Sequence, residues 1–462
     1  MQKTLTLFQE IATMLLTDEK NNPVAPFIAS EDLFETLDIS LQETPLLEEE
    51  FVIALKNLIA KTPKTATNAF FNQLFGGRNE KAVLGDLLSV LLNNSMYTYK
   101  AAGVQIGVEK AILEKVNSLI GWGATSGGTI ATGGSMTNFM AMLMARDFKN
   151  TAIRKEGMTH KMTVYTSTES HYSIPKNASF SGIGRDQVRY IPVDERGCMV
   201  TSLLETQIKK DRDEGYLPTM VNATAGTTVL GAFDDITSLS AICKKYAIWL
   251  HIDGAYCGSV LFSKKYKNLI NGVELADSFS FNAHKMIGTP LTCSLLQVKD
   301  KKYLYQSFAN EAEYLYQTDE DDFNPGKTSL QCGRRNDALK FWTLWKSVGT
   351  QGLETIVDKQ FELAEIARNY VLNHSEYTLY SYEDSISVCF NYKGIPARDI
   401  CTLLYEKSKL LVGYGTFNGE EFIRLVTINA QNEKEDILSF FNIIETFVAQ
   451  NETLFLKGIK TT

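Results

Sequence analysis

The sequence has no excess of positive charge. Its 462 residues contain 46 lysines and arginines against 54 aspartates and glutamates, which gives a formal net charge of −8. A general nucleic-acid-binding protein needs a basic face, so this balance argues against a nucleic-acid partner. We therefore expect the chain to act on small molecules.

Cysteine is sparse, and its spacing excludes two further classes of protein. The chain has seven cysteines, with no CxxC pair and no cluster of Cys and His at the spacing of a zinc site. An odd number without tight repeats does not make a disulfide framework, and buried reduced thiols are typical of cytoplasmic proteins. We expect no metal site and a cytoplasmic location.

Long apolar runs are absent as well. No stretch approaches the roughly 18 uninterrupted apolar residues that a membrane span requires, so no membrane partner is expected. The apolar pattern of residues 1–20 is interrupted by Gln9, Glu10 and Thr13. That interruption is typical of an amphipathic helix and not of a signal peptide.

The chain does contain an alternation of helical patterns with short β-rich runs, over about residues 76–345. Short apolar strands separated by amphipathic helices indicate an α/β fold, with a mainly parallel sheet covered by helices on both faces. Residues 1–75 are expected to form an N-terminal helical segment, and residues 346–462 a small C-terminal α+β domain. The runs lie near residues 129, 162, 188, 219, 247 and 278.

The first candidate site is a glycine-containing turn after one of these runs, because ligands of open α/β sheets bind beyond the carboxyl ends of the strands. In TIATGGSMTNFMAMLMAR, residues 129–146, a short strand runs into Gly133, Gly134 and a helix that begins near Ser135. Glycines allow the backbone to approach a ligand, and a helix N-terminus attracts anions, so this turn is a candidate phosphate cradle. It is neither a Walker motif nor GxGxxG, and a turn without a ligand explains it equally well.

Two further strand ends carry ionisable residues. Asp253 ends the apolar run IWLHID, where it either faces a site or caps a helix. Lys285 follows the run SFSFN together with Asn282 and His284. A buried lysine at this place is a candidate nucleophilic amine, and a solvated surface lysine is the alternative.

Together the three segments supply what pyridoxal 5′-phosphate (PLP) requires. A cradle holds its phosphate, a lysine binds it covalently, and an acid keeps the pyridine nitrogen protonated so that the ring accepts electrons. His171, in STESHYSIPKNASFSG, adds an aromatic ring for stacking on the cofactor. His160, His251 and His374 have no such context, and we expect them to be structural or surface residues.

These motifs resemble those of the group II PLP-dependent amino-acid decarboxylases, over about residues 65–450. That family has the aspartate-aminotransferase-like fold, PLP fold type I. The resemblance implies three catalytic residues: Lys285 binds the cofactor, Asp253 pairs with the pyridine nitrogen, and His171 stacks on the ring. The cofactor-binding positions that it implies are Gly134, Ser135, His171, Thr228, Asp253, Ala255, Asn282, His284 and Lys285.

The segment AFFNQLFGG, residues 69–77, resembles the acidic-substrate branch of the family, which comprises glutamate, cysteine-sulfinate and aspartate decarboxylases. The resemblance implies that Gln73 helps to receive the distal acid of the substrate. Phe75 stands where glutamate decarboxylases usually have serine, and a bulky side chain there favours a three-carbon acid. Arg424 matches the arginine that clamps the α-carboxylate, with a surface strand arginine as the alternative. The family also implies a homodimer with the site at the subunit interface.

The implied function is therefore the removal of CO2 from a small acidic L-amino acid to leave an amine, with aspartate or cysteine sulfinate favoured and glutamate as a further candidate. One departure concerns the proton donor. Phe323 stands where the family often has the tyrosine that reprotonates the substrate carbon, and Tyr314 and Tyr316 are nearby alternatives. Two rival functions stay open: decarboxylation coupled to oxidative deamination, and a non-catalytic paralogue that binds the cofactor or a partner.

Overall fold

The chain packs as two compact units. The computed structural model describes residues 1–310 and 321–456. The large unit comprises Arg78–Glu362 and Ser381–Ser387, and the small unit comprises Met1–Gly77, Leu363–Tyr380 and Val388–Thr462. The division at residues 75 and 345 that the sequence suggested stays a prediction.

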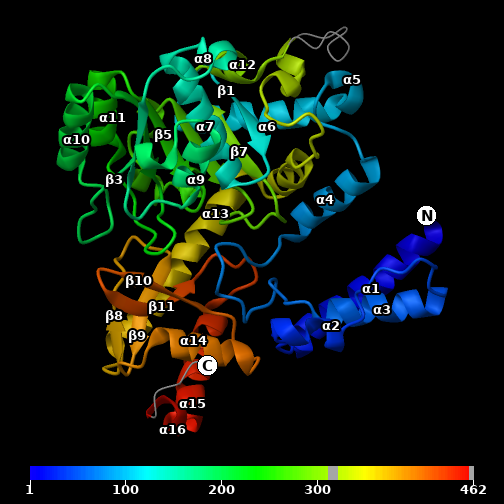
Figure 1. The fold of residues 1–462 in the computed structure, drawn as a ribbon. Coiled ribbons are helices and arrows are strands. Elements are labelled where there is room, and N and C mark those ends of the chain that lie inside the picture. The colour runs from blue at the N-terminus through cyan, green and yellow to red at the C-terminus, as the bar shows by residue number, and fades with distance from the viewer. Residues whose placement is uncertain (311–320, 457–462) are drawn as a thin grey trace. The chain divides into compact units, whose positions relative to one another are not determined.

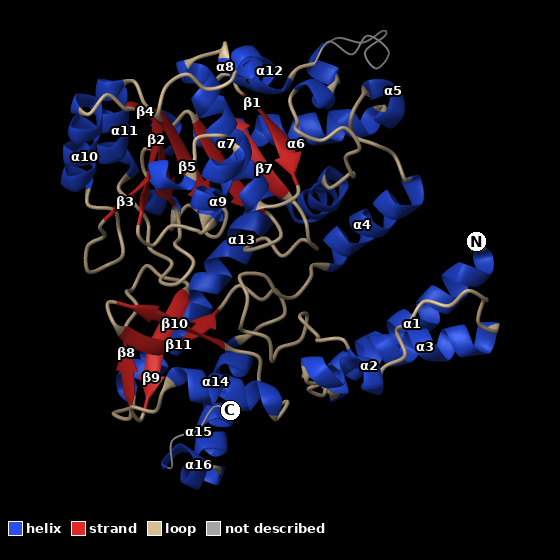
Figure 2. Cartoon of the chain, in the orientation of Figure 1, coloured by secondary structure: helices blue, strands red, loops and turns tan. Residues whose placement is uncertain are grey.

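The large unit is built on a seven-stranded sheet with the order β1-β7-β6-β5-β4-β2-β3 (Figures 1 and 2). The neighbouring strands β2 to β6 pair in parallel, whereas β7 is antiparallel to both β1 and β6. The mainly parallel sheet expected from the sequence is thus confirmed, and β7 is a strand that the sequence did not predict. The strands are β1 (Gly127–Ala131), β2 (Met162–Ser167), β3 (Val188–Ile191), β4 (Leu217–Thr224), β5 (Trp249–Gly254), β6 (Ser278–Asn282) and β7 (Ser294–Val298).

Helices cover both faces of this sheet. Successive residues of a strand point to opposite faces. Val164 of β2 joins an apolar cluster with Met140 of α7 and Ile174 of α9, whereas the hydroxyl of the next residue, Tyr165, donates a hydrogen bond of 2.7 Å to Asp211 of α10. The helices of the large unit include α4 (Glu80–Leu92), α5 (Tyr99–Ala102), α6 (Val104–Ile120), α7 (Gly134–Lys149), α8 (Ile153–Glu156), α9 (Ser173–Phe180), α10 (Thr201–Asp213), α11 (Ile236–Tyr246) and α12 (Lys302–Phe308), and α13 (Ala338–Asn373) begins in it.

The small unit combines a four-stranded sheet with helices, as the sequence predicted for the C-terminal part. The sheet has the order β10-β11-β9-β8, and its apolar core includes Phe390, Ile423, Phe440 and Phe441. The N-terminal helices α1 and α3 contact each other and contain no fully buried residue. The elements are α1 (Gln2–Asn21), α2 (Leu33–Thr36), α3 (Glu48–Lys61), β8 (Tyr377–Leu379), β9 (Ser387–Tyr392), α14 (Ala397–Glu406), β10 (Gly413–Phe417), β11 (Glu420–Val426), α15 (Lys434–Gln450) and α16 (Glu452–Leu456).

Among residues 1–310 and 321–456, no helix combines the length and the apolar character needed to cross a bilayer. The helix α1, which the sequence predicted as amphipathic, carries polar residues along most of its length.

A buried ion pair holds β1 against α6 in the large unit. The Arg334 guanidinium donates to Glu109 Oε1 at 2.8 Å, to the Ile130 carbonyl at 2.9 Å and to the Met96 carbonyl at 2.9 Å. Both side chains of the pair are 3% exposed, so each charge is stabilised in the interior by the opposite charge of its partner. Because Ile130 lies in β1, the pair fixes the strand that leads into the glycine turn.

Glu109→Gln should therefore lower the free energy of unfolding by about 3–5 kcal/mol, because Arg334 would keep its charge in the interior without a counter-charge. Urea unfolding at a fixed protein concentration measures the loss. Glu114→Gln is the control, since its side chain is 65% exposed and pairs with Lys110 at the surface. Equal unfolding midpoints for the two variants would contradict this account.

Candidate active site

A cavity of about 220 Å³ lies at the carboxyl ends of the parallel strands of the large unit. Its lining comes from the turns after β1, β2, β4, β5 and β6, which is where a ligand of an open α/β sheet is expected. All nine residues that the sequence singled out for the cofactor line it. They are Gly134, Ser135, His171, Thr228, Asp253, Ala255, Asn282, His284 and Lys285.

One end of the cavity is the N-terminus of α7. The first N–H groups of a helix have no partner within the helix, and together with the helix dipole they attract an anion. A Cβ added to Gly134 would lie 2.9 Å from the Cβ of Ala255 and 3.3 Å from Asn282 Nδ2, so a side chain would close this end. Asn282 Oδ1, whose amide lies beside Gly134, and Thr224 Oγ1, on the strand position that pairs with Asp253, are buried without a hydrogen-bond partner among the described residues. These features suit a ligand that carries a phosphate group and a ring with a hydroxyl group.

Asp253 lies near the end of β5 and is almost fully buried. Its Oδ1 accepts a hydrogen bond of 3.0 Å from the Ala255 N–H, and its Oδ2 accepts one of 2.7 Å from Asn138 Nδ2. The following short helix is capped by Cys257, so the reading of Asp253 as a helix cap does not hold. A carboxylate held in this way inside the cavity suits a protonated pyridine nitrogen.

Lys285 is half-buried in the turn that follows β6, and it is not the solvated surface lysine that the sequence left open. Its ammonium lies 6.0 Å from the centroid of the Tyr256 ring, which also lines the cavity. Burial lowers the pKa of the neighbouring His284 to about 3, and the charge of Lys285 acts in the same direction. His284 is consequently neutral near pH 7, and its Nδ1 accepts a hydrogen bond of 2.9 Å from the Cys293 N–H.

His171 follows β2 and contributes an uncharged aromatic ring. Burial lowers the pKa of His171, the charge of Asp253 opposes this shift, and the charge of Lys285 adds to it. The Ser173 N–H donates to His171 Nδ1 at 3.2 Å, and Ser173 Oγ lies 2.8 Å from the same nitrogen. The Tyr172 ring packs beside the imidazole with 4.2 Å between the centroids.

The residues present in this cavity fit PLP. The helix N-terminus and the small Gly134 suit its phosphate, Asp253 suits its pyridine nitrogen, and Lys285 offers the amine that binds its aldehyde. His171 and Ala255 are placed for the faces of a flat ring. The individual roles of these residues stay predictions.

The predicted substrate residues lie in the small unit. Gln73 and Phe75 line a cavity of about 720 Å³ together with Asn72 and Tyr414. Arg424 of β11 is half-buried, and its Nη2 donates a hydrogen bond of 3.1 Å to the carbonyl of Asn72. The three predicted substrate residues thus belong to one neighbourhood of this unit.

Phe323 does not line the cofactor cavity. Its ring packs against an apolar cluster of Met96, Ala102 and Ile106, and it meets the Tyr99 ring edge-on at 5.8 Å between centroids. Tyr314 and Tyr316, the two alternatives for the proton donor, lie outside the described residues.

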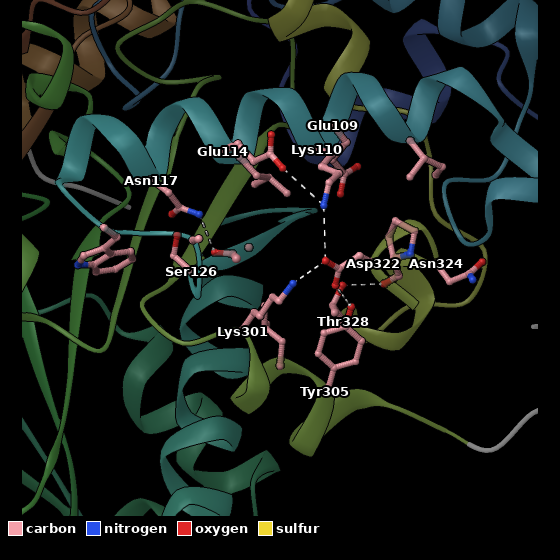
Figure 3. A pocket seen from close by; sticks show the side chains of 18 of the residues that line it. Glu109, Lys110, Glu114, Asn117, Ser126, Lys301, Tyr305, Asp322, Asn324 and Thr328 are labelled. Carbon is pink, nitrogen blue, oxygen red and sulfur yellow. Dashed lines mark hydrogen bonds and ion pairs between the residues drawn. The ribbon is translucent and has the colours of Figure 1, made fainter. Parts of the chain in front are cut away.

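A larger cavity of about 500 Å³ lies at the other end of β1, beside α6 and α12 (Figure 3). Several of its charged side chains bind one another: Asp322 pairs with Lys110 at 3.7 Å and with Lys301, and the Tyr305 hydroxyl donates to Asp322 at 2.9 Å. None of the residues predicted for the site is among its lining residues, so size alone does not identify the functional cavity.

The structure adds residues that sequence reasoning missed. Asn138 lines the cofactor cavity and donates to Asp253, and His251 lies directly behind Asn138. The sequence predicted a structural or surface role for His251, and the structure shows it to be fully buried. The signal for it was the period-two spacing of Trp249, His251 and Asp253, which puts all three on one face of β5.

The sequence of this chain matches a family model and several characterised proteins. Residues 30–393 match the family model described as the pyridoxal-dependent decarboxylase conserved domain. The mouse acidic amino acid decarboxylase GADL1 is 34% identical over 460 residues, which cover 94% of this chain and 83% of the relative. The rat cysteine sulfinic acid decarboxylase is 37% identical over 366 residues, which cover 78% of this chain and 74% of the relative.

Solved structures agree with the sequence matches. The crystal structure of mouse CSAD aligns with a TM-score of 0.91 at 31% sequence identity, over 96% of this chain and 98% of that chain. The structure of Catharanthus roseus tryptophan decarboxylase in complex with L-tryptophan aligns with a TM-score of 0.87 at 21% identity, over 97% of this chain and 98% of that chain. The second likeness concerns the fold alone.

Proposed function

Because this chain belongs to the pyridoxal-dependent decarboxylase family, we propose that it decarboxylates a small acidic L-amino acid, with aspartate or cysteine sulfinate preferred over glutamate. Family membership confirms three expectations from the sequence: PLP is the cofactor, the protein is a PLP-dependent carboxy-lyase, and the fold is PLP fold type I. The observation that carries the proposal is the cavity in which Lys285, Asp253 and His171 converge. The acidic substrate class is supported by the names of the mouse and rat relatives.

In this proposal each residue of the cavity has one task. PLP, when bound, supplies a ring that takes up the electrons released as CO2 leaves. Lys285 would hold it covalently through Nζ, and the Asp253 carboxylate would accept a hydrogen bond from the N–H of the protonated pyridine ring. Neutral His171 covers one face of the ring, and the first N–H groups of α7 hold the phosphate.

Substrate binding falls to the small unit. Arg424 carries a planar guanidinium with several N–H donors, which suits the α-carboxylate of an amino acid. The hydrogen bond from Arg424 to the Asn72 carbonyl orients its fork beside the segment that carries Gln73. Gln73 offers an amide N–H to the distal acid, and Phe75 limits the length of the substrate.

The direct test is release of 13CO2 from carboxyl-labelled aspartate, cysteine sulfinate and glutamate by the purified holoenzyme. We expect stoichiometric amine with each turnover. Aldehyde and hydrogen peroxide in place of amine would identify decarboxylation coupled to oxidative deamination. Absence of turnover with all three acids would overturn the proposed substrate class.

The substrate preference gives a size prediction for Phe75. One methylene is worth about 1–3 kcal/mol, or roughly 10- to 200-fold in kcat/KM, so the wild type should prefer aspartate or cysteine sulfinate to glutamate by that factor. Phe75→Ser should narrow this gap, because it adds volume and a hydroxyl to the cavity that Gln73 also lines. The measurement is kcat/KM for the three acids in both proteins.

Phe34→Ser is the matched control, because Phe34 belongs to the same unit and is exposed on α2. It should leave the ratio of the three kcat/KM values unchanged. The ring of Phe75 also packs against Phe70, with 5.9 Å between centroids. If wild type prefers glutamate, or if Phe75→Ser leaves the ratios as they are, Phe75 only packs and the length argument is wrong.

We further infer a cytoplasmic homodimer. The helices α1 and α3 expose apolar side chains, among them Phe8, Leu16, Phe51 and Ile53. Exposed apolar surface of this kind is typical of a contact between protein chains, and a second copy is the commonest partner. Sedimentation equilibrium of the holoenzyme tests the dimer.

A further inference from the structure

We propose that Asn138 is a positioning residue that holds Asp253 toward the pyridine nitrogen and His171 toward the ring, and that His251 fixes Asn138 in turn. The inference rests on the proposed function, because it assigns Asp253 and His171 their tasks toward PLP. It adds two residues, Asn138 and His251, to that site. The inference is based on a series of buried hydrogen bonds in which each group donates to the next and the last acceptor is Asp253.

Asn138 is the centre of this set. It lies in the second turn of α7, and its side chain is 1% exposed. Nδ2 donates to Asp253 Oδ2 at 2.7 Å and to Ser173 Oγ at 3.1 Å, which uses both of its hydrogens. Because a carboxylate only accepts, the amide nitrogen and not the amide oxygen must face Asp253. The orientation of the amide is therefore determined.

His251 holds the opposite side of the amide. Its Nε2 lies 3.1 Å from Asn138 Oδ1, and since an amide oxygen only accepts, Nε2 carries the proton. Nδ1 then accepts from Ser278 Oγ at 2.8 Å, and the Trp249 Nε1–H donates to the same Oγ at 2.9 Å. Burial lowers the pKa of His251 to about 4, so the imidazole stays neutral near pH 7 and keeps this tautomer.

The result is a directed chain of donors that ends on a carboxylate. Trp249 donates to Ser278, Ser278 to His251, His251 to Asn138, and Asn138 to Asp253. Donors in series polarise one another in a low-dielectric interior. This series of hydrogen bonds keeps the Asp253 carboxylate in one orientation as an acceptor, which a partner for a protonated pyridine N–H requires.

The second hydrogen of Asn138 reaches the other side of the ring site. Ser173 Oγ accepts from Asn138, so its own hydrogen is available for His171 Nδ1 at 2.8 Å. The Ser173 N–H donates to the same ring nitrogen at 3.2 Å. His171 Nδ1 is therefore the acceptor, and the ring proton lies on Nε2. One amide thus sets the Asp253 carboxylate and the tautomer of His171 together.

The test replaces Asn138 with leucine, which has a similar volume and no polar group. With PLP labelled by 15N in its ring, Asn138→Leu should move the nitrogen resonance toward that of unprotonated pyridine. Affinity of the apoprotein for PLP should fall about tenfold, the size of one lost hydrogen bond to a charged group. The kcat should fall about 10²-fold with little change in KM, because a displaced group affects the reacting geometry more than binding.

Asn117→Leu is the matched control, since Asn117 is also a buried asparagine on a helix and lines the larger cavity instead. It should change the stability but neither the nitrogen resonance nor the affinity for PLP. If Asn138→Leu behaves as this control does, Asn138 only fills space and the proposal is overturned.

Two variants of His251 keep the proposal testable if Asn138→Leu does not fold. His251→Phe keeps a ring but loses the donor, and should shift the nitrogen resonance in the same direction as Asn138→Leu. His251→Gln restores an N–H toward Asn138 Oδ1, and should return the resonance toward the wild-type value. Equal resonances in the two variants would overturn the role of His251. The nitrogen resonance and the affinity for PLP are measured without substrate. If the wild type releases no CO2, the proposed substrate class fails, but these two measurements still test the roles of Asn138 and His251.

Discussion

Lys285→Ala should reduce decarboxylation by roughly 10³-fold or more, because the amine that binds the cofactor acts at the reacting atoms. Lys285 follows β6 directly and lines the cavity with Asp253 and His171. Borohydride reduction of wild type should attach the mass of the cofactor to the peptide that contains Lys285. The same treatment of the variant should leave every peptide unmodified.

Lys264→Ala serves as the control, because the side chain of Lys264 is 82% exposed and pairs with Glu354 away from the cavity. It should retain wild-type turnover and a modified Lys285 peptide. Cofactor attached to another lysine in Lys285→Ala would show that Lys285 is not the attachment site, and the proposed roles around it would have to be reassigned.

Asp253→Asn should leave PLP bound but slow decarboxylation by about 10²–10⁴-fold, the range for a group that controls a proton in the transition state. An amide in place of the carboxylate removes the charge that keeps the pyridine nitrogen protonated, and the ring then accepts electrons less readily. Single-turnover CO2 release at saturating substrate separates this loss from weaker binding.

The variant Asp213→Asn, at the exposed end of α10, removes the same charge far from the cavity residues and should be neutral. Asp253→Glu keeps the charge and should recover part of the rate. Near-normal turnover by Asp253→Asn would contradict the proposed role of Asp253. It would also contradict the positioning roles of Asn138 and His251, which act through Asp253.

The strands β2, β4, β5 and β6 were predictable because each is an almost entirely buried run, as in IWLHID, which ends at Asp253. β7 was missed although all five of its residues are buried, since it follows a turn and its antiparallel pairing with β1 and β6 has no local signature. β10 was missed because GYGTF contains two glycines and alternates in exposure. In both cases pairing with a neighbouring strand, and not local propensity, decides the structure.

The cofactor residues were predictable because strand ends and glycine turns are visible in the sequence and carry the motifs of the family. Asn138 and His251 were not, because their contact joins residues 113 positions apart. Asn138 stands among the methionines of α7, so the local sequence gives no sign that this one polar side chain has a buried partner. The role of a buried polar side chain depends on its hydrogen-bond partners, and those partners can be identified only once the fold is known.

The place of β1 in the sheet also determines when the cofactor pocket is completed during synthesis. In the seven-stranded sheet β1 pairs with β7 alone, and Gly127 lies opposite Val298. The strand that leads into Gly133 and Gly134 therefore has no hydrogen-bonded neighbour until β7 has emerged from the ribosome. Pairings between such distant segments form late, and the surfaces that they will cover stay exposed until then. A nascent chain that ends before β7 therefore leaves the strand before the glycine turn without its pairing partner.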